Sequence, residues 1–116
     1  METAELDRFQ GALYSLREDL RKQLADLGAN PDEESLEGLE FDFGFADSAQ
    51  STAERGKVLA LIDRLRTQLR DVDRALKKID QGTYGQCDNC GKSIPPERLE
   101  ALPYSTLCIE CKQKSA

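Results

Sequence analysis

Apolar residues recur at spacings of three and four along two long stretches of the chain. The first set comprises Leu6, Phe9, Leu13, Leu16, Leu20, Leu24 and Leu27. The second set comprises Ile62, Leu65, Leu69, Val72, Leu76 and Ile79. A stripe this narrow is typical of a helix that packs against one partner helix instead of a broad core. The pattern therefore predicts two long helices, each with a single apolar seam.

Helix-ending signals mark where each stretch stops. Gly28 and Pro31 follow the first stripe, Gly82 follows the second, and capping-box patterns indicate that the second helix starts near Asp47. A connection of about 18 residues between the helices is longer than most loops. It allows an antiparallel coiled-coil hairpin over residues 1–81, with its tip at about 29–47. A parallel dimer is the alternative, because heptads alone do not distinguish pairing within a chain from pairing between chains. Two stripes of similar length in one chain favour the hairpin, and we expect a monomer.

Charge is distributed unevenly along this hairpin. The chain has 16 Lys and Arg, 22 Asp and Glu, and a net charge of −6. No basic residue occurs between Lys22 and Arg55, although nine acidic residues lie there. The distribution predicts a strongly negative tip; a loop kept soluble by its charge is the alternative interpretation. Six bases of the second helix lie outside its stripe, and we expect them to pair with the first helix or face water: Arg64, Arg66, Arg70, Arg74, Lys77 and Lys78.

Composition excludes several classes of function. The chain has no His, which removes the commonest general base and excludes hydrolases built on Ser-His-Asp or Cys-His. No nucleophile–base pair is visible, so we expect no enzyme. Apolar runs such as 58–62 are far shorter than the roughly 20 residues of a membrane helix. Acidic residues near the start are unlike a secretory leader. We expect a cytoplasmic protein that does not bind a membrane.

The last third of the chain contains two Cys-x-x-Cys pairs, Cys87 with Cys90 and Cys108 with Cys111. This spacing is expected of a tetrathiolate zinc site. Four thiolates complete the coordination sphere, so we expect one structural Zn²⁺. Gly91 follows the first pair, where such a turn often needs a positive φ. Two disulfides or a thioredoxin-like redox motif are the alternatives, but no leader peptide and no α/β alternation accompany the cysteines.

We therefore expect an all-α protein, in which the hairpin is followed over residues 82–116 by a small four-cysteine finger with a short C-terminal helix. This finger has four basic and four acidic residues, so it lacks a basic patch. Direct sequence-specific DNA binding is not expected, and a nucleic-acid-binding zinc ribbon is a minor alternative. The side chains expected to pack around the metal are Tyr84, Pro95, Pro96, Leu99, Leu102 and Tyr104.

Four segments of the chain closely resemble the DksA/TraR zinc-finger family: Gly82–Gly91, Ile94–Pro95, Arg98–Ala101 and Cys108–Lys112. The strong match begins near Arg74, and the hairpin layout extends it more loosely over the rest. The resemblance implies a four-cysteine zinc finger and binding to bacterial RNA polymerase. It further implies that the coiled-coil tip enters the secondary channel of the polymerase and that the protein regulates transcription initiation.

Tips in this family carry the pattern Asp-x-x-Asp-x-Ala. Asp47 matches the first Asp, whereas Gln50 replaces the second Asp and Thr52 replaces the Ala. The predicted partner-binding tip consists of Asp42, Phe45, Asp47, Gln50 and Thr52. Asp47 also fits a plain helix N-cap. Because a tip carboxylate is missing, a second hypothesis stays open: a zinc-stabilised coiled-coil adaptor with another protein partner and without the family activity.

Overall fold

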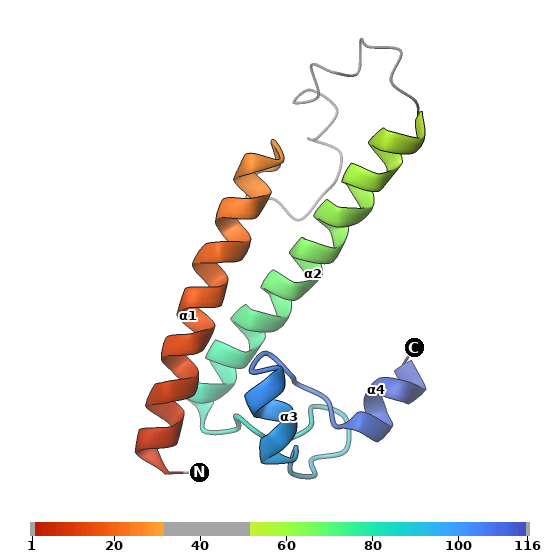
Figure 1. Ribbon diagram of the computed structural model, residues 1–116. Coiled ribbons are helices and arrows are strands. Elements are labelled where there is room, and N and C mark those ends of the chain that lie inside the picture. Colours follow the sequence, from red (N-terminus) through yellow and green to blue (C-terminus); the bar gives the residue numbers. More distant parts are fainter. Residues whose placement is uncertain (1, 32–51, 116) are drawn as a thin grey trace. The chain divides into compact units, whose positions relative to one another are not determined.

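The computed structural model describes residues 2–31 and 52–115. These residues form α1 (Thr3–Asp26), α2 (Thr52–Gln81), α3 (Pro96–Ala101) and α4 (Ile109–Ser115), as Figure 1 shows. The described ranges contain no strand, and their one β-bridge pairs Gln86 with Ser93. The expected all-α class is therefore confirmed. The short C-terminal helix is α4, whereas α3 was not predicted.

Most of the predicted tip lies outside the described residues. Asp42, Phe45, Asp47 and Gln50 all fall in the undescribed range, as does the predicted helix start near Asp47. Thr52 is the first residue of α2. The roles assigned to these tip residues stay predictions.

The chain packs as two units, and both long helices contribute to each of them. One unit comprises Met1–Arg17 with Arg70–Ala116, and the other comprises Glu18–Leu69. In the first unit the Nε of Arg17 donates a hydrogen bond to Asp73, at 2.7 Å. The first unit joins the earlier part of α1 to the later part of α2, and the second joins the later part of α1 to the earlier part of α2. Within each unit the two helices therefore run antiparallel (Figure 1). The predicted domain boundary between residues 81 and 82 stays a prediction.

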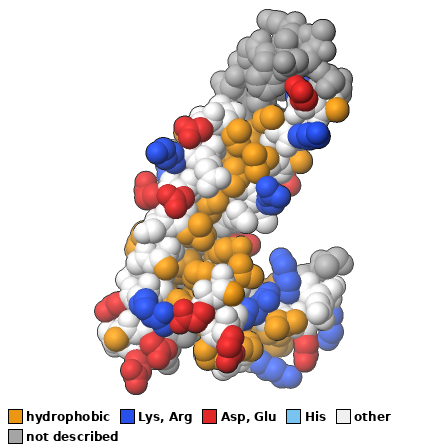
Figure 2. Space-filling view, in the orientation of Figure 1, with side chains coloured by type: hydrophobic (Ala, Val, Ile, Leu, Met, Phe, Trp, Pro, Cys, Tyr) orange, Lys and Arg blue, Asp and Glu red, His pale blue; other side chains and the backbone are white. Residues whose placement is uncertain are grey.

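The two predicted apolar stripes form the seam between α1 and α2. Buried members of the seam are Phe9, Leu13, Leu20, Leu24, Ile62, Leu65, Leu69, Val72 and Leu76. The half-buried members are Leu6, Leu16, Leu27 and Ile79. In Figure 2 hydrophobic side chains gather along the line where the helices meet, with charged side chains to either side. Burial along one stripe per helix confirms the coiled-coil prediction.

Glycines close both long helices in the same way. Gly28 has a φ of 83°, its N–H donates to Ala25, and the next N–H, of Ala29, donates to Leu24. Gly82 has a φ of 79°, and an equivalent pair of hydrogen bonds ends α2. This paired arrangement is the Schellman motif, which needs a left-handed residue after the last turn. Glycine adopts that conformation without steric cost, so the sequence places both helix ends correctly.

Candidate metal centre

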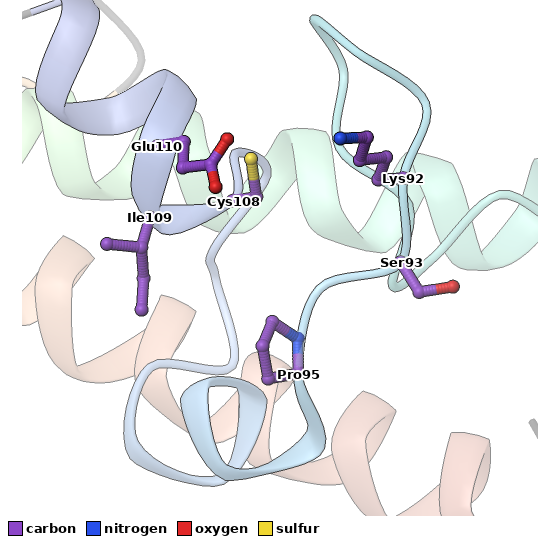
Figure 3. A pocket seen from close by; sticks show the side chains of 6 residues that line it. All are labelled: Lys92, Ser93, Pro95, Cys108, Ile109 and Glu110. Carbon is purple, nitrogen blue, oxygen red and sulfur yellow. The ribbon is translucent and has the colours of Figure 1, made fainter.

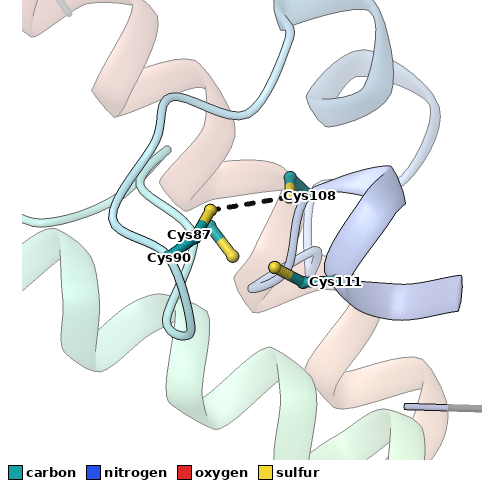
Figure 4. Close-up of side chains that lie close together, drawn as sticks. All are labelled: Cys87, Cys90, Cys108 and Cys111. Atoms are coloured by element: carbon teal, nitrogen blue, oxygen red, sulfur yellow. Dashed lines mark hydrogen bonds between the residues drawn. The ribbon is translucent and has the colours of Figure 1, made fainter. Parts of the chain in front are cut away.

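Four cysteine sulfurs meet at one point of the unit that contains the ends of the chain. The Sγ atoms of Cys87, Cys90, Cys108 and Cys111 all lie within 4.8 Å of one another, and those of Cys90 and Cys108 are 3.7 Å apart. Figure 4 shows the side chains pointing toward one another from two segments of the chain. A tetrahedron with Zn–S bonds of about 2.3 Å has sulfurs about 3.8 Å apart. All four thiols are free, and the geometry fits a tetrathiolate metal site.

A tight turn positions the first pair of ligands. The N–H of Cys87 donates to the carbonyl of Lys92 at 2.8 Å, and the N–H of Gly91 donates back to the carbonyl of Cys87 at 3.0 Å. Gly91 has a φ of 76°, as expected from the sequence. The second pair lies at the start of α4, with Cys108 just before the helix and Cys111 in its first turn. A rigid turn and a helix start therefore present two sulfurs each.

Asn89, which the sequence analysis did not single out, joins the two pairs. Its backbone N–H donates to the Sγ of Cys87 at 3.4 Å, and its side-chain amide donates to the Sγ of Cys111 at 3.3 Å. Donors aimed at sulfur favour the thiolate form, which is the form that binds a metal. The only sequence signal for this role is the place of Asn89 between the cysteines of the first pair.

The surroundings push the pKa values of two ligands apart in the absence of metal. Backbone N–H groups, first that of Cys90, lower the pKa of Cys87 to about 6. The Asn89 amide lowers the pKa of Cys111, but the neighbouring cysteines, led by Cys108, and burial outweigh it and raise the value to about 11. Four clustered sulfurs cannot all ionise without a compensating charge. A divalent cation held by the four sulfurs would supply that charge.

A small apolar core supports the centre. Tyr84, Ile94 and Leu99 are buried, and the hydroxyl of Tyr84 donates to the carbonyl of Pro103 at 2.8 Å. Burial, together with the charge of Glu100, raises the pKa of Tyr84 to about 12. The expected packing is confirmed for Tyr84 and Leu99. Pro95, Pro96 and Leu102 are exposed and Tyr104 is half-buried, whereas Ile94, which was not among the expected residues, is buried.

Contacts from both long helices hold this finger within the same unit. Arg8 on α1 forms two hydrogen bonds to Glu100 on α3, at 3.0 and 2.6 Å. Phe9 lies beside Tyr84, with ring centroids 5.6 Å apart. Arg74 on α2 binds both carboxylate oxygens of Asp88, at 3.1 and 3.2 Å. The finger therefore has polar and aromatic contacts with the hairpin helices.

Two of the bases on α2 depart from the sequence expectation. Lys78 and Arg66 are buried, with 2% and 5% of their surface exposed. Lys78 donates to Asp88 at 2.7 Å and to the carbonyl of Gln86. Arg66 donates to the carbonyl of Asn30 at 3.3 Å. The expectation of pairing with the first helix or facing water is wrong for Lys78, because its carboxylate partner Asp88 lies in the finger. Arg66 does not face water, since it is buried and reaches the main chain beyond the end of α1.

A pocket of about 260 Å³ borders the metal centre. Its lining residues are Lys92, Ser93, Pro95, Cys108, Ile109 and Glu110 (Figure 3). One wall belongs to the first turn of α4 and another to the segment before α3. Cys108, a predicted metal ligand, is therefore also part of the pocket wall.

An antiparallel helical hairpin together with a four-cysteine site is typical of a small zinc-finger protein that contains a coiled coil. Residues 82–115 match the family described as the prokaryotic dksA/traR C4-type zinc finger. The chain is 30% identical over 115 residues to the RNA polymerase-binding transcription factor DksA of Salmonella typhimurium, covering 97% of this chain and 72% of that protein. The protein belongs to the DksA/TraR family.

Two further comparisons concern a solved structure and a relative matched over part of its length. The structure of transcription factor DksA2 from Pseudomonas aeruginosa superimposes with a TM-score of 0.63 at 30% identity, covering 99% of this chain and 85% of that one. Protein YteA of Bacillus subtilis is 50% identical over 64 residues, which is 55% of this chain and 27% of YteA. The DksA relatives are named as transcription factors and not as enzymes. No helix in the described ranges combines the length and the hydropathy needed to cross a bilayer.

Proposed function

We propose that the protein is a transcription regulator that binds bacterial RNA polymerase. The observation that carries the proposal is the similarity over nearly the whole chain to a relative named as an RNA polymerase-binding transcription factor. That similarity includes the hairpin as well as the finger, so it covers both parts that the family role requires. The proposal places the protein in the cytoplasm, where the polymerase acts.

We further propose that the centre holds one structural Zn²⁺ through Cys87, Cys90, Cys108 and Cys111. Zinc supplies a fixed tetrahedral link between the first turn and α4, and it leaves no open position for substrate. Residues around the cysteines position their sulfurs and donate hydrogen bonds to them. The turn at Gly91 aims two sulfurs. The backbone N–H of Asn89 donates to one of them, that of Cys87, and the side-chain amide of Asn89 donates to Cys111 of the other pair.

The hairpin tip is the proposed contact with the secondary channel of the polymerase. The segment between Lys22 and Arg55 has acidic residues and no basic ones, so it would be attracted to a basic channel lining. Within the tip, Asp42, Phe45 and Asp47 are the proposed contacts, together with Gln50 and Thr52. Direct DNA recognition has no part in this proposal, and the protein acts as a monomer.

One observation favours a second candidate function. Gln50 and Thr52 replace the second Asp and the Ala of the family tip. The loss of a carboxylate at Gln50 removes charge where it would act most strongly on a metal-bearing centre. A protein with this tip fits a zinc-stabilised coiled-coil adaptor for another protein partner.

The two candidates differ in their affinity for purified RNA polymerase. We expect the zinc-loaded protein to bind the enzyme and to compete with a known secondary-channel factor. Asp47→Ala should bind more weakly or lose its effect on transcription, whereas Asp63→Ala, an exposed acid on α2, serves as the matched control. Absence of binding at high protein concentration would favour the adaptor. Equal behaviour of both variants would remove Asp47 from the contact.

A further inference from the structure

The side chain of Lys78 carries an ammonium group that has no part in the proposed function, yet this side chain is buried. Only 2% of the residue is exposed. Removing an ammonium from water is costly unless its donors are satisfied and an opposite charge is close. Two of the three N–H donors of Lys78 are bonded and a negative charge is close, because Lys78 donates to the carboxylate of Asp88 and to the carbonyl of Gln86.

The two acceptors flank one metal ligand. Gln86 precedes Cys87 and Asp88 follows it, so a single ammonium fixes the chain on both sides of Cys87. The N–H of Asp88 also donates to the carbonyl of Thr106 at 2.8 Å, which ties this point to the segment that leads into the second pair of cysteines. The main chain of Lys78 contributes as well, since its carbonyl accepts the N–H of Thr83 at 2.8 Å.

The charge balance at this point also favours the metal-bound state. Lys78 and Arg74 both contact Asp88, so two positive charges meet one negative charge. Four thiolates around a divalent ion have a formal net charge of about −2. A surplus positive charge beside that centre stabilises the thiolates, as partners behind the ligands commonly do.

We propose that Lys78 is a positioning residue of the metal centre, which raises metal affinity by fixing the chain around Cys87. The inference rests on the four-cysteine centre and not on polymerase binding, so the two can fail separately. Loss of such a supporting contact typically lowers metal affinity by roughly 10–100-fold. We expect a decrease of at least about tenfold for Lys78→Met, which keeps the long stem and removes the charge.

The experiment measures the Zn²⁺ affinity of the full chain by competition with a chelator. Lys77→Met is the matched control, since it makes the same chemical change at the neighbouring, exposed position. Asp88→Asn removes the charge of the partner, and the Lys78→Met/Asp88→Asn double variant completes a cycle. Thermal unfolding with and without Zn²⁺ accompanies each measurement, and Co²⁺ spectra report whether four sulfurs still bind.

The expected result is weaker Zn²⁺ binding in Lys78→Met and Asp88→Asn, unchanged binding in Lys77→Met, and a double variant that loses less than the sum. A purely structural role would change the unfolding temperature equally with and without Zn²⁺ and leave the affinity unchanged, which would overturn the proposal. Equal affinities of the Lys78→Met and Lys77→Met variants would overturn it too. If Lys78→Met does not fold, the Zn²⁺ affinity of Asp88→Asn alone tests the proposal, and an unchanged affinity would overturn it.

Discussion

Replacing glycine with alanine should have opposite effects at two positions of the long helices. Gly82 ends α2 with a φ of 79°, where a left-handed residue with a Cβ costs about 1–2 kcal/mol. Alanine also restricts the unfolded chain, which returns about 0.4–1 kcal/mol. No heavy atom lies within 4 Å of a Cβ built on Gly82, so crowding adds nothing. We expect Gly82→Ala to reduce the free energy of unfolding by roughly 1 kcal/mol.

Gly11 lies inside α1, and a Cβ built there also meets no atom within 4 Å. Its φ is ordinary for a helix, so Gly11→Ala should increase the free energy of unfolding by about 0.5–1 kcal/mol. Gly56 in α2 offers the same test again. Urea denaturation followed by circular dichroism, at a fixed metal concentration, measures all three variants. If Gly82→Ala stabilises the protein as much as Gly11→Ala, the argument from the left-handed helix end is refuted.

Three other substitutions or conditions test the seam, the metal centre and the finger core. Leu13 has no exposed surface, so Leu13→Ala should reduce the free energy of unfolding, measured by urea denaturation, by about 2–5 kcal/mol. Tyr14 is 54% exposed, so Tyr14→Ala should reduce it by less than about 0.5 kcal/mol. The pKa of Cys111, about 11 without metal, leaves this thiol protonated at neutral pH, so metal binding must release a proton and weaken as pH falls. Calorimetry in two buffers with different ionisation enthalpies measures this release, and a binding heat independent of buffer would contradict it. Tyr84→Phe loses the hydrogen bond to Pro103, so it should reduce the free energy of unfolding by about 1 kcal/mol. Thermal unfolding of the metal-loaded variant and of the metal-loaded wild-type protein measures this difference.

The seams and the cysteine cluster could be predicted because their signals are local. Burial of Leu13 and Val72 follows from spacings of three and four, which repeat along one helix face. The cysteine pairs need only their own spacing. α3 was missed because six residues that start at a proline are too few to show a helical period. Leu99 is the one buried residue of α3, and a single apolar residue in a short segment does not indicate a helix.

The burial of Lys78 could not be predicted from the pattern of α2. A lysine beside an apolar stripe usually extends its stem over the seam and keeps its ammonium in water. Lys78 is buried because the chain, after the end of α2, folds back so that Gln86 and Asp88 contact its ammonium group. That return depends on the Gly82 turn and on the cysteine pair, so the contact belongs to the tertiary fold and not to helical periodicity.

The same contacts change the meaning of the charge count in the finger. Four acids balance four bases in residues 82–116, but Asp88 and Glu100 are bound by bases of the hairpin helices. The other charged residues of the finger are Lys92, Arg98, Lys112, Lys114, Glu97 and Glu110. Together with Arg8, Arg74 and Lys78, which bind Asp88 and Glu100, the finger has seven bases and four acids, a net charge of +3 that a tetrathiolate zinc centre with a formal charge of about −2 would reduce to about +1. The metal-loaded finger then offers only about one excess positive charge to phosphates, which supports the proposal that this protein acts through a protein partner and not through direct DNA binding.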